Sequence, residues 1–328
     1  MVTDDEIARA AEVLRAGGLV AFPTETVYGL GADASSPAAL ARLYAVKGRP
    51  ADHPVIVHVP DATTIDEWAV DVPDGARRLA EAWWPGPLTL VLRRAAHVLD
   101  AVTGGQDTVG LRVPDQPVAR RLLTAFGGGI AAPSANRFGR VSPTNADDVR
   151  TDLGDDVDVV LDGGACRVGV ESTIVDCSGA PFRVLRLGGI GRTELERVAG
   201  EHVLKFGSDS LLRVPGSLAS HYAPRAQVHA VRAAEVRAAV EDEIRAGARV
   251  GVVAPVGEHA ADLPAVAALL GAPATVEEYA HELYRWLRAA DAQRLDVVVA
   301  ALPADTDDAL GAAVTDRLRR AAASRSDT

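Results

Sequence analysis

The chain has 328 residues, a formal net charge of -11, and 48% hydrophobic, 24% charged and 4% aromatic residues. This length predicts two domains, each with enough residues for its own core. The acidic balance argues against a general nucleic-acid coat, because such proteins are normally basic over the binding domain.

Cysteine usage and the N-terminus indicate the compartment. Cys166 and Cys177 are too few for a disulfide framework, and they do not have the spacing of metal ligands. Residues 1–6 are acidic and lead into an amphipathic helix, unlike a signal peptide. No apolar run reaches membrane-spanning length. We therefore predict a soluble, cytoplasmic protein with no membrane partner.

The first elements are a helix and a strand followed by a polar turn. Thr3 or Asp4 can cap a helix that ends at the glycine pair 17–18, and residues 19–22 are predicted as a short strand. The stretch 23–33 then places hydroxyl groups before a Gly-x-Gly pair. A dinucleotide-binding fingerprint needs such glycines directly between a strand and a helix, so we reject that interpretation.

A helix over residues 37–46 is predicted to lead into a cationic loop. The loop carries Lys47 and Arg49 on either side of Gly48, and a β-branched strand over 55–59 follows. Lysine gives a mobile point charge and arginine a planar fork, which together suit a polyphosphate or a carboxylate. The alternative is a solvated basic turn before an edge strand.

The remainder of the first two-thirds alternates strands with helices. Residues 133–136 form a Pro-Ser-Ala-Asn turn after a strand, and Thr144 can cap the next helix. The expected strands are 88–92, 108–114, 130–132, 157–161, 173–177 and 182–187, and the expected helices are 73–84, 115–126 and 192–198.

Four cations, Lys47, Arg49, Arg112 and Arg186, fall at loop or strand ends beside Thr- and Ser-rich turns. Strand ends of an α/β sheet commonly hold ligands. The sequence shows no Ser-His-Asp order, no Cys-His nucleophile and no paired carboxylates. These residues predict a site for an anionic ligand, a nucleotide bound without a P-loop. Such a site would act by positioning and charge neutralisation, as in phosphoryl or nucleotidyl transfer.

The regular pattern lapses over residues 201–224 and restarts afterwards. We predict a catalytic domain over 1–203, a linker over 204–224 and a smaller α/β domain over 225–328. The linker contains a His-Tyr pair at 221–222. The last domain is expected to have a parallel sheet, with strands at 227–231, 249–254 and 296–302 and helices at 233–246, 276–290 and 307–322.

Taken together, several short segments resemble the Sua5/YrdC/YwlC family of threonylcarbamoyl-AMP synthases. The Lys47-x-Arg49 and Ser134-x-Asn136 pair is the family signature, and the order and density of the matches make accident improbable. The linker and the final α/β unit resemble the longer, two-domain form. The matching segments are 22–31, 47–50, 84–89, 110–114, 133–136, 171–176 and 221–224.

The resemblance implies a fold and a reaction. The fold would be α/β, with a twisted open mixed sheet in the YrdC-like domain and a Rossmann-like C-terminal domain. The reaction would join L-threonine, bicarbonate and ATP into L-threonylcarbamoyl-AMP with release of pyrophosphate. In the family, the threonine amine captures bicarbonate or CO2, and the carbamate oxygen attacks the α-phosphate. A downstream tRNA threonylcarbamoyl-transferase complex would use the product for N6-threonylcarbamoylation of tRNA adenosine 37. This chain would not need to bind tRNA directly.

The resemblance also implies roles for individual residues. The signature residues would be catalytic, and magnesium would be held by phosphates and water rather than by protein ligands. The family usually has Asn at the position of His53. The threonine pocket would use Thr26, His58, Arg112, the backbone at Ala132, and Ser172; the ATP side would use Lys47, Arg49, His53, Thr108, Ser134, Asn136, Ser142, Arg186 and Tyr222.

Two other functions remain open from the residues. One is a module that binds double-stranded RNA or tRNA without synthase activity, although the net charge opposes it. The other is a transferase that handles carbamoyl-adenylate, although the chain shows none of the extra modules of such enzymes. For His58, the structural alternative is a strand histidine with a satisfied hydrogen bond. For Thr26 and Ser172, it is a polar residue at the sheet edge.

Overall fold

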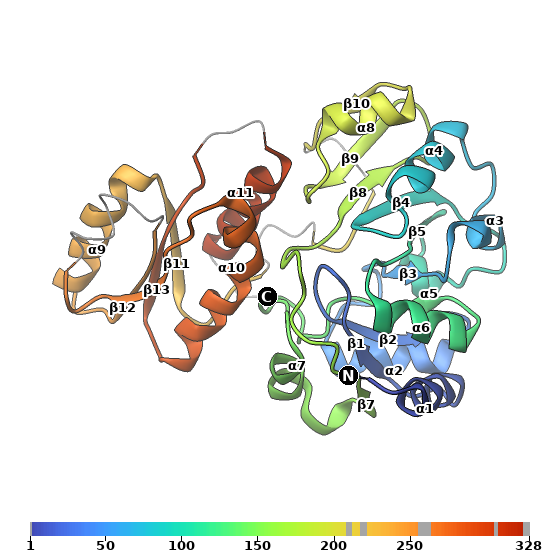
Figure 1. Cartoon of the computed structure of the whole chain (residues 1–328), viewed down its shortest axis with the longest axis horizontal. Coiled ribbons are helices and arrows are strands. Elements are labelled where there is room, and N and C mark those ends of the chain that lie inside the picture. The colour runs from blue at the N-terminus through green and yellow to red at the C-terminus, as the bar shows by residue number, and fades with distance from the viewer. Residues whose placement is uncertain (1, 208–211, 217–221, 255–263, 305–307, 324–328) are drawn as a thin grey trace. The chain divides into compact units, whose positions relative to one another are not determined.

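The computed structural model describes residues 2–207, 212–216, 222–254, 264–304 and 308–323 (Figure 1). The chain divides into two compact units. The first unit comprises residues 1–138, 142–167 and 171–217, and the second comprises residues 139–141, 168–170 and 218–328. The second unit thus takes two short segments, 139–141 and 168–170, from within the expected catalytic domain, and residues 208–211 and 217–221 of the expected linker lie outside the described part.

The described residues of the first unit contain a single ten-stranded mixed sheet, as expected from the sequence. Its strands are β1 (Val20–Phe22), β2 (Gly29–Asp33), β3 (Ile56–His58), β4 (Leu88–Arg93), β5 (Thr108–Arg112), β6 (Ile130–Ala131), β7 (Val159–Val160), β8 (Thr173–Asp176), β9 (Phe182–Arg186) and β10 (Val203–Leu204). The order across the sheet is β10-β9-β8-β4-β5-β3-β6-β2-β1-β7.

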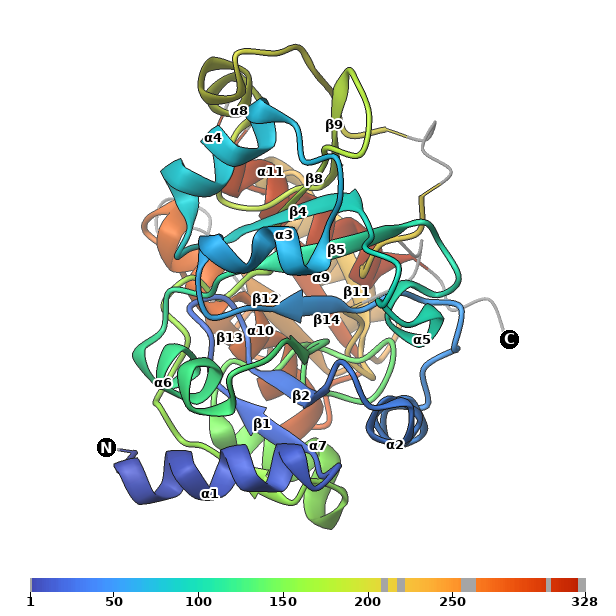
Figure 2. The same ribbon diagram turned by 90° about the vertical axis from the view of Figure 1, so that its right-hand side faces the viewer.

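Eight α-helices accompany this sheet in the described residues. They are α1 (Asp4–Arg15), α2 (Pro37–Lys47), α3 (Ile65–Trp68), α4 (Asp74–Trp83), α5 (Asp100–Thr103), α6 (Pro117–Phe126), α7 (Ala146–Leu153) and α8 (Arg192–Ala199). Figure 2 looks onto the side of the first unit that carries α3, α4 and α6, with β4, β5 and β3 running behind them.

Helix ends follow the local chemistry of the sequence. Thr3 and Glu6 form a reciprocal capping box at the start of α1, with the Glu6 backbone N–H donating to Thr3 Oγ1 over 3.2 Å. The helix α2 ends at Gly48, whose φ of 62° is in the left-handed region that favours glycine. This ending places Lys47 in the last turn of the helix and Arg49 just beyond it.

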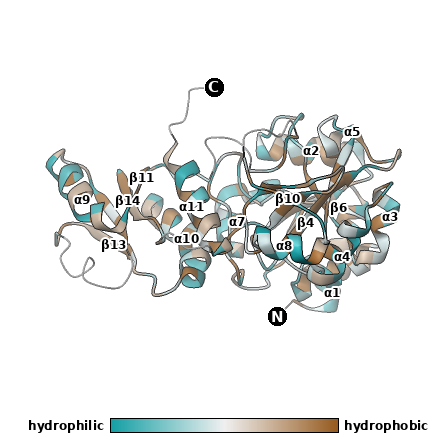
Figure 3. Cartoon of the chain, turned by 90° about the horizontal axis from the view of Figure 1, so that it is seen from above, coloured by the Kyte–Doolittle hydropathy of each residue, from teal (hydrophilic) through white to brown (hydrophobic). Residues whose placement is uncertain are grey.

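Period-two alternation gives the central strands two different faces. The Leu88, Leu90 and Leu111 side chains are completely buried in the main hydrophobic core. The alternate positions of the same strands, which include Thr89 and Arg112, therefore project from the opposite face. Figure 3 shows the strands as the most hydrophobic part of this unit, with the helices carrying hydrophilic colour outside them.

The second unit contains a four-stranded parallel sheet in the order β11-β14-β12-β13 within the described residues, which confirms the predicted parallel arrangement. Its core is built largely from strand and helix valines, among them Val240, Val252 and Val299. The elements are β11 (Gln227–Val231), α9 (Val236–Arg245), β12 (Val250–Val253), β13 (Ala268–Gly271), α10 (Val276–Ala292), β14 (Val297–Ala301) and α11 (Ala309–Ala322).

Three strands were not predicted. The strand β2 covers the Gly-rich stretch that we expected to be a turn, and β10 and β13 fall where no regular pattern was recognised. In β2 a Cβ atom at Gly31 would lie 2.8 Å from Ile130 Cγ2 and 2.9 Å from Phe22 Cε1. The glycine is therefore needed for close packing within a strand. Among the described residues, none of the helices is both long and apolar enough to cross a membrane.

Candidate functional site

Lys47 joins the two signature segments of the sequence. Its Nζ donates hydrogen bonds of 2.5 Å to the carbonyl oxygens of both Ser134 and Asn136. In return, the backbone N–H of Phe138 donates to the Lys47 carbonyl oxygen over 2.8 Å. Burial, followed by the charge of Arg49, holds the pKa of Lys47 well below its ordinary value. The structure thus brings Lys47, Ser134 and Asn136 together, as the sequence predicted.

Arg49 and His53 form the next part of the same loop. The Arg49 guanidinium donates to the carbonyl oxygens of His53 (3.3 Å) and Pro54 (2.7 Å), and it lies 5.6 Å from the centre of the Phe138 ring. The His53 ring meets the same phenyl ring edge-on, with centroids 5.4 Å apart. Burial and the nearby Arg49 charge lower the pKa of His53. Arg49 and His53 therefore both pack against Phe138, which follows the Ser134-x-Asn136 turn.

Arg112 ends β5 beside His58, which ends β3. The two residues are direct partners in the parallel register of these strands. Arg112 Nη2 lies 2.7 Å from Glu25 Oε1, and both side chains are buried, with exposed fractions of 5% and 1%. Arg112 Nε also donates to the Gly86 carbonyl oxygen over 3.2 Å. Burial, and then the Arg112 charge, lower the pKa of His58 to about 3, so its ring is neutral at physiological pH.

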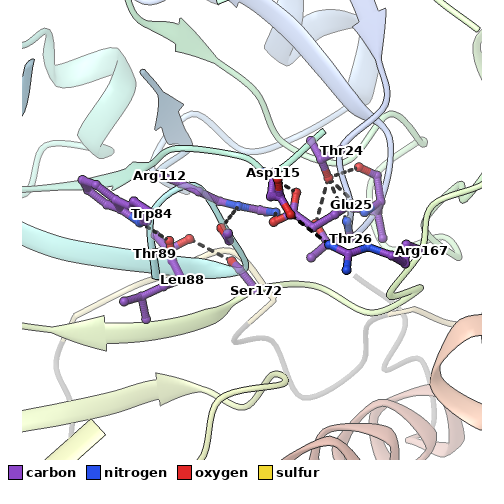
Figure 4. Close-up of polar contacts among 12 residues, drawn as sticks. Thr24, Glu25, Thr26, Trp84, Leu88, Thr89, Arg112, Asp115, Arg167 and Ser172 are labelled. Atoms are coloured by element: carbon purple, nitrogen blue, oxygen red, sulfur yellow. Dashed lines mark hydrogen bonds and ion pairs between the residues drawn. The ribbon is translucent and has the colours of Figure 1, made fainter. Parts of the chain in front are cut away.

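Glu25 belongs to a hydroxyl-rich loop between β1 and β2. Thr24 and Thr26 flank it, and their hydroxyl oxygens lie 2.8 Å apart. Figure 4 shows the Arg112 side chain extending toward this loop, with Asp115 and Arg167 beside it. The second Glu25 oxygen accepts a hydrogen bond of 3.1 Å from the Asp115 backbone N–H. The loop therefore presents a buried carboxylate and a buried hydroxyl to the end of β5.

Ser172 is held from two neighbouring strands. The Thr89 hydroxyl on β4 lies 2.8 Å from the Ser172 hydroxyl. Arg186, at the end of β9, donates to both the hydroxyl (2.9 Å) and the carbonyl oxygen (3.0 Å) of Ser172. A third Arg186 nitrogen donates to the Pro215 carbonyl oxygen over 3.0 Å. Arg186 thus links the expected ATP side to the expected threonine side.

The other predicted site residues take varied positions. Thr108 is half-buried at the start of β5 and lines a small cavity together with Thr89. Ala132 follows β6, and its N–H donates to the Ile56 carbonyl oxygen over 2.9 Å. The completely buried Ser142 donates to Glu171 Oε1 over 2.7 Å.

Tyr222 lies in the second unit, where its ring is buried. It stacks on Tyr284 with centroids 5.7 Å apart, and the Arg317 guanidinium carbon lies 5.1 Å from its centre. Its φ of 62° is unusual for a residue other than glycine. Tyr284 and Arg317 both belong to the second unit. The contact of Tyr222 with ATP, which the resemblance implies, stays a prediction.

Three side chains of the site were not predicted: Glu25, Thr89 and Glu171. Glu25 lies inside a segment that carried the resemblance, but its partner Arg112 comes from a distant strand, so nothing local revealed the ion pair. Thr89 had a usable signal, because it is a polar residue alternating with leucines in a strand. Among the described residues, no group of three or more His, Cys, Asp or Glu side chains could hold a metal ion.

Comparison with known proteins gives consistent results. Residues 12–188 match the Sua5/YciO/YrdC family, described as "Telomere recombination", and residues 190–323 match the family described as "Threonylcarbamoyl-AMP synthase, C-terminal domain". A threonylcarbamoyl-AMP synthase of Pyrococcus abyssi is 41% identical over 330 residues, which covers 98% of this chain and 95% of the relative. One of Bacillus subtilis is 39% identical and covers 98% of this chain and 94% of the relative.

A solved structure agrees with this similarity. The crystal structure of P. abyssi Sua5 complexed with L-threonine superimposes with a TM-score of 0.91 at 38% identity. The superposition covers 98% of this chain and 95% of that chain. The likeness therefore extends over both units.

Proposed function

This chain belongs to the two-domain Sua5 family of threonylcarbamoyl-AMP synthases, and we propose that the buried cations of its first unit divide that reaction between an ATP side and a threonine side. Membership of this family confirms the expected synthase activity, in which ATP is a substrate. The assignment of individual residues to the two substrates is our proposal.

The contact that best supports this assignment is the one between Lys47 and the Ser134-x-Asn136 turn. Two hydrogen bonds of 2.5 Å fix the ammonium group to neutral carbonyl oxygens, so its positive charge is not cancelled by an anionic partner in these bonds. With Arg49 two residues away, this arrangement favours a polyanionic ligand. We assign it to the triphosphate of ATP and to stabilising the departing pyrophosphate.

On the threonine side, we assign the substrate carboxylate to Arg112. An arginine fork binds carboxylates bidentately, and this one is already oriented by its bond to Gly86. Ser172 and Thr89 lie on the same sheet face and supply hydroxyl groups for orientation. His58, which is neutral, supplies a hydrogen-bonding ring without a charge.

The proposed chemistry needs no protein nucleophile. The threonine ammonium group releases a proton, the free amine and bicarbonate give a carbamate and water, and the carbamate oxygen displaces pyrophosphate from the α-phosphate of ATP. The protein contributes position and charge neutralisation. Mg2+ fits as an ion carried by the phosphates and water, because the described residues lack a cluster of metal ligands. When bound, it would neutralise phosphate charge.

We further propose that the product is passed to a transferase that threonylcarbamoylates N6 of adenosine 37 in tRNA. A mixed anhydride of a carbamic acid with AMP is an activated acyl donor and hydrolyses readily in water. A partner that consumes it quickly therefore suits this chemistry. Direct binding of tRNA to this chain is not needed for that transfer.

Pyrophosphate release by the purified chain tests the assignment. We expect release with ATP, Mg2+ and bicarbonate only when L-threonine is added, and much less with L-serine. Lys47→Met should reduce kcat/KM by about 100-fold or more, because it removes a charge from the departing phosphate. Lys205→Met changes the other lysine of the chain in the same way and should leave the rate unchanged. Pyrophosphate release at the same rate with and without L-threonine would refute the proposal.

A further inference from the structure

The threonine side of the site contains a buried anion that no assignment so far has used. Glu25 Oε1 lies 2.7 Å from Arg112 Nη2, and the Glu25 side chain is only 1% exposed. Neither of these two atoms makes a hydrogen bond of acceptable angle within the described residues. Two buried, oppositely charged groups are thus adjacent but not optimally bonded, which leaves both of them able to take a further partner.

Thr26 adds a hydrogen-bond acceptor beside Glu25. The Thr24 hydroxyl donates its single proton to the Val27 carbonyl oxygen over 2.6 Å. In the 2.8 Å contact between the two threonine hydroxyls, Thr26 must therefore be the donor. The Thr26 oxygen then has lone pairs but no proton to offer to a ligand. A group bound between Thr26 and Glu25 has to be a hydrogen-bond donor.

Other charged groups nearby do not perform the same function. His58 is neutral, because burial and the Arg112 charge lower its pKa to about 3. The Asp115 carboxylate forms an ion pair of 2.9 Å with Arg167 and is about half exposed. Glu171 is also buried, but it accepts a hydrogen bond of 2.7 Å from Ser142. Among the described residues, Glu25 is the buried carboxylate that lies against Arg112.

We propose that Glu25 binds the α-ammonium group of the substrate and restricts the site to zwitterionic amino acids, an inference that rests on the proposed assignment of the substrate carboxylate to Arg112. The reason is the charge balance. Arg112 and Glu25 together are neutral, and a zwitterion keeps the buried site neutral when it binds. A carboxylate without an ammonium group adds one uncompensated negative charge, which a buried site disfavours strongly.

This inference separates the recognition of the amine from that of the carboxylate. Glu25 would be a specificity-determining residue that contacts the reacting amine, while Arg112 contacts the group that does not react. Substitution of Glu25 by the isosteric glutamine should weaken L-threonine binding by roughly 10- to 100-fold, the range expected for a hydrogen bond to a charged group. The same substitution should leave binding of a plain carboxylate unchanged or make it tighter.

Calorimetric titration of the full chain with two ligands tests this difference. The ligands are L-threonine and 3-hydroxybutyrate, which keeps the carboxylate and the hydroxyl but lacks the ammonium group. For Glu25→Gln we expect weaker threonine binding together with equal or tighter hydroxybutyrate binding. Glu81→Gln, the same change at an exposed position of α4, should alter neither affinity.

The other outcomes refute the inference in distinguishable ways. Equal weakening of both ligands by Glu25→Gln would show that Glu25 only orients Arg112. Unchanged threonine binding would show that the ammonium group lies elsewhere. Failure of the wild-type chain to bind threonine would overturn the proposed function itself. If Glu25→Gln does not fold, Glu25→Asp keeps the charge and should still prefer threonine over hydroxybutyrate; loss of that preference would also refute the inference.

Discussion

Lys47 and Arg112 are both buried cations of the same sheet domain, but they are held by different partners. Lys47 is bonded to two neutral carbonyl oxygens, whereas Arg112 lies against the Glu25 carboxylate. A lysine held by carbonyl oxygens has no countercharge in these bonds, while an arginine paired with a carboxylate presents a neutral pair. Under our proposal, the partner of each cation, and not the cation alone, decides whether the site accepts a polyanion or a zwitterion.

The largest effect should follow from breaking the charged pair. Arg112→Met leaves the Glu25 carboxylate buried without a countercharge, so we expect the free energy of unfolding to fall by about 3–5 kcal/mol. Urea denaturation monitored by circular dichroism measures this change. The double variant Arg112→Met/Glu25→Gln should recover most of the loss. A free energy of unfolding for Arg112→Met within about 1 kcal/mol of the wild-type value would contradict the difference that we draw between Arg112 and Lys47.

A smaller effect is expected at the other cation. Lys47→Met leaves the Ser134 and Asn136 carbonyl oxygens without their donor, and unsatisfied neutral groups cost about 1–3 kcal/mol. ATP binding should nevertheless be lost, because the available charge is removed. Urea denaturation and nucleotide titration on the same preparation separate the two effects. A larger loss of stability in Lys47→Met than in Arg112→Met would contradict the expected order of the two effects.

The smallest effect concerns His58, whose pKa is lowered by burial and then by the Arg112 charge. Its pKa is about 3 in the folded protein and about 6.5 in the unfolded chain. Below pH 6.5 the unfolded chain therefore binds a proton that the folded protein does not, and the free energy of unfolding falls as the pH is lowered. We expect a contribution of about 1.4 kcal/mol per pH unit that is present in the wild type and absent in His58→Gln.

Urea denaturation at pH values between 6.5 and 4.5 measures the two slopes. Parallel curves for the wild type and the variant would show that His58 takes up its proton at a similar pH in both states. In that case neither burial nor the Arg112 charge would lower the pKa of His58 in the folded protein.

Periodicity and capping predicted most elements of the fold. The α2 helix was expected over 37–46 and occupies Pro37–Lys47, and the α10 helix was expected over 276–290 and occupies Val276–Ala292. The missed strand β2 shows the limit of this approach. Glycines usually indicate turns, but Gly31 is required here because the Phe22 ring leaves no room for a side chain.

Contacts among the candidate site residues were predictable where the signal is local. Lys47, Arg49 and the Ser134-x-Asn136 turn were recognised from short motifs, and the structure brings them together. Glu25 was missed, because its significance comes from Arg112, which is distant in sequence and becomes its neighbour only in the folded sheet. Single-sequence patterns report on neighbours along the chain, so charge pairs between distant strands escape them.

The register of β3 and β5 determines how deletions in these strands affect activity. His58 and Arg112 are direct partners, and a shift of one residue in either strand would turn a functional side chain to the opposite face. The β3 residues Ile56 and Val57 are buried on both faces, so hydrophobic burial alone discriminates poorly against such a shift. A one-residue deletion in either strand could therefore yield a compact but inert protein, and expression level or solubility would be a poor substitute for an activity assay when variants of this region are screened.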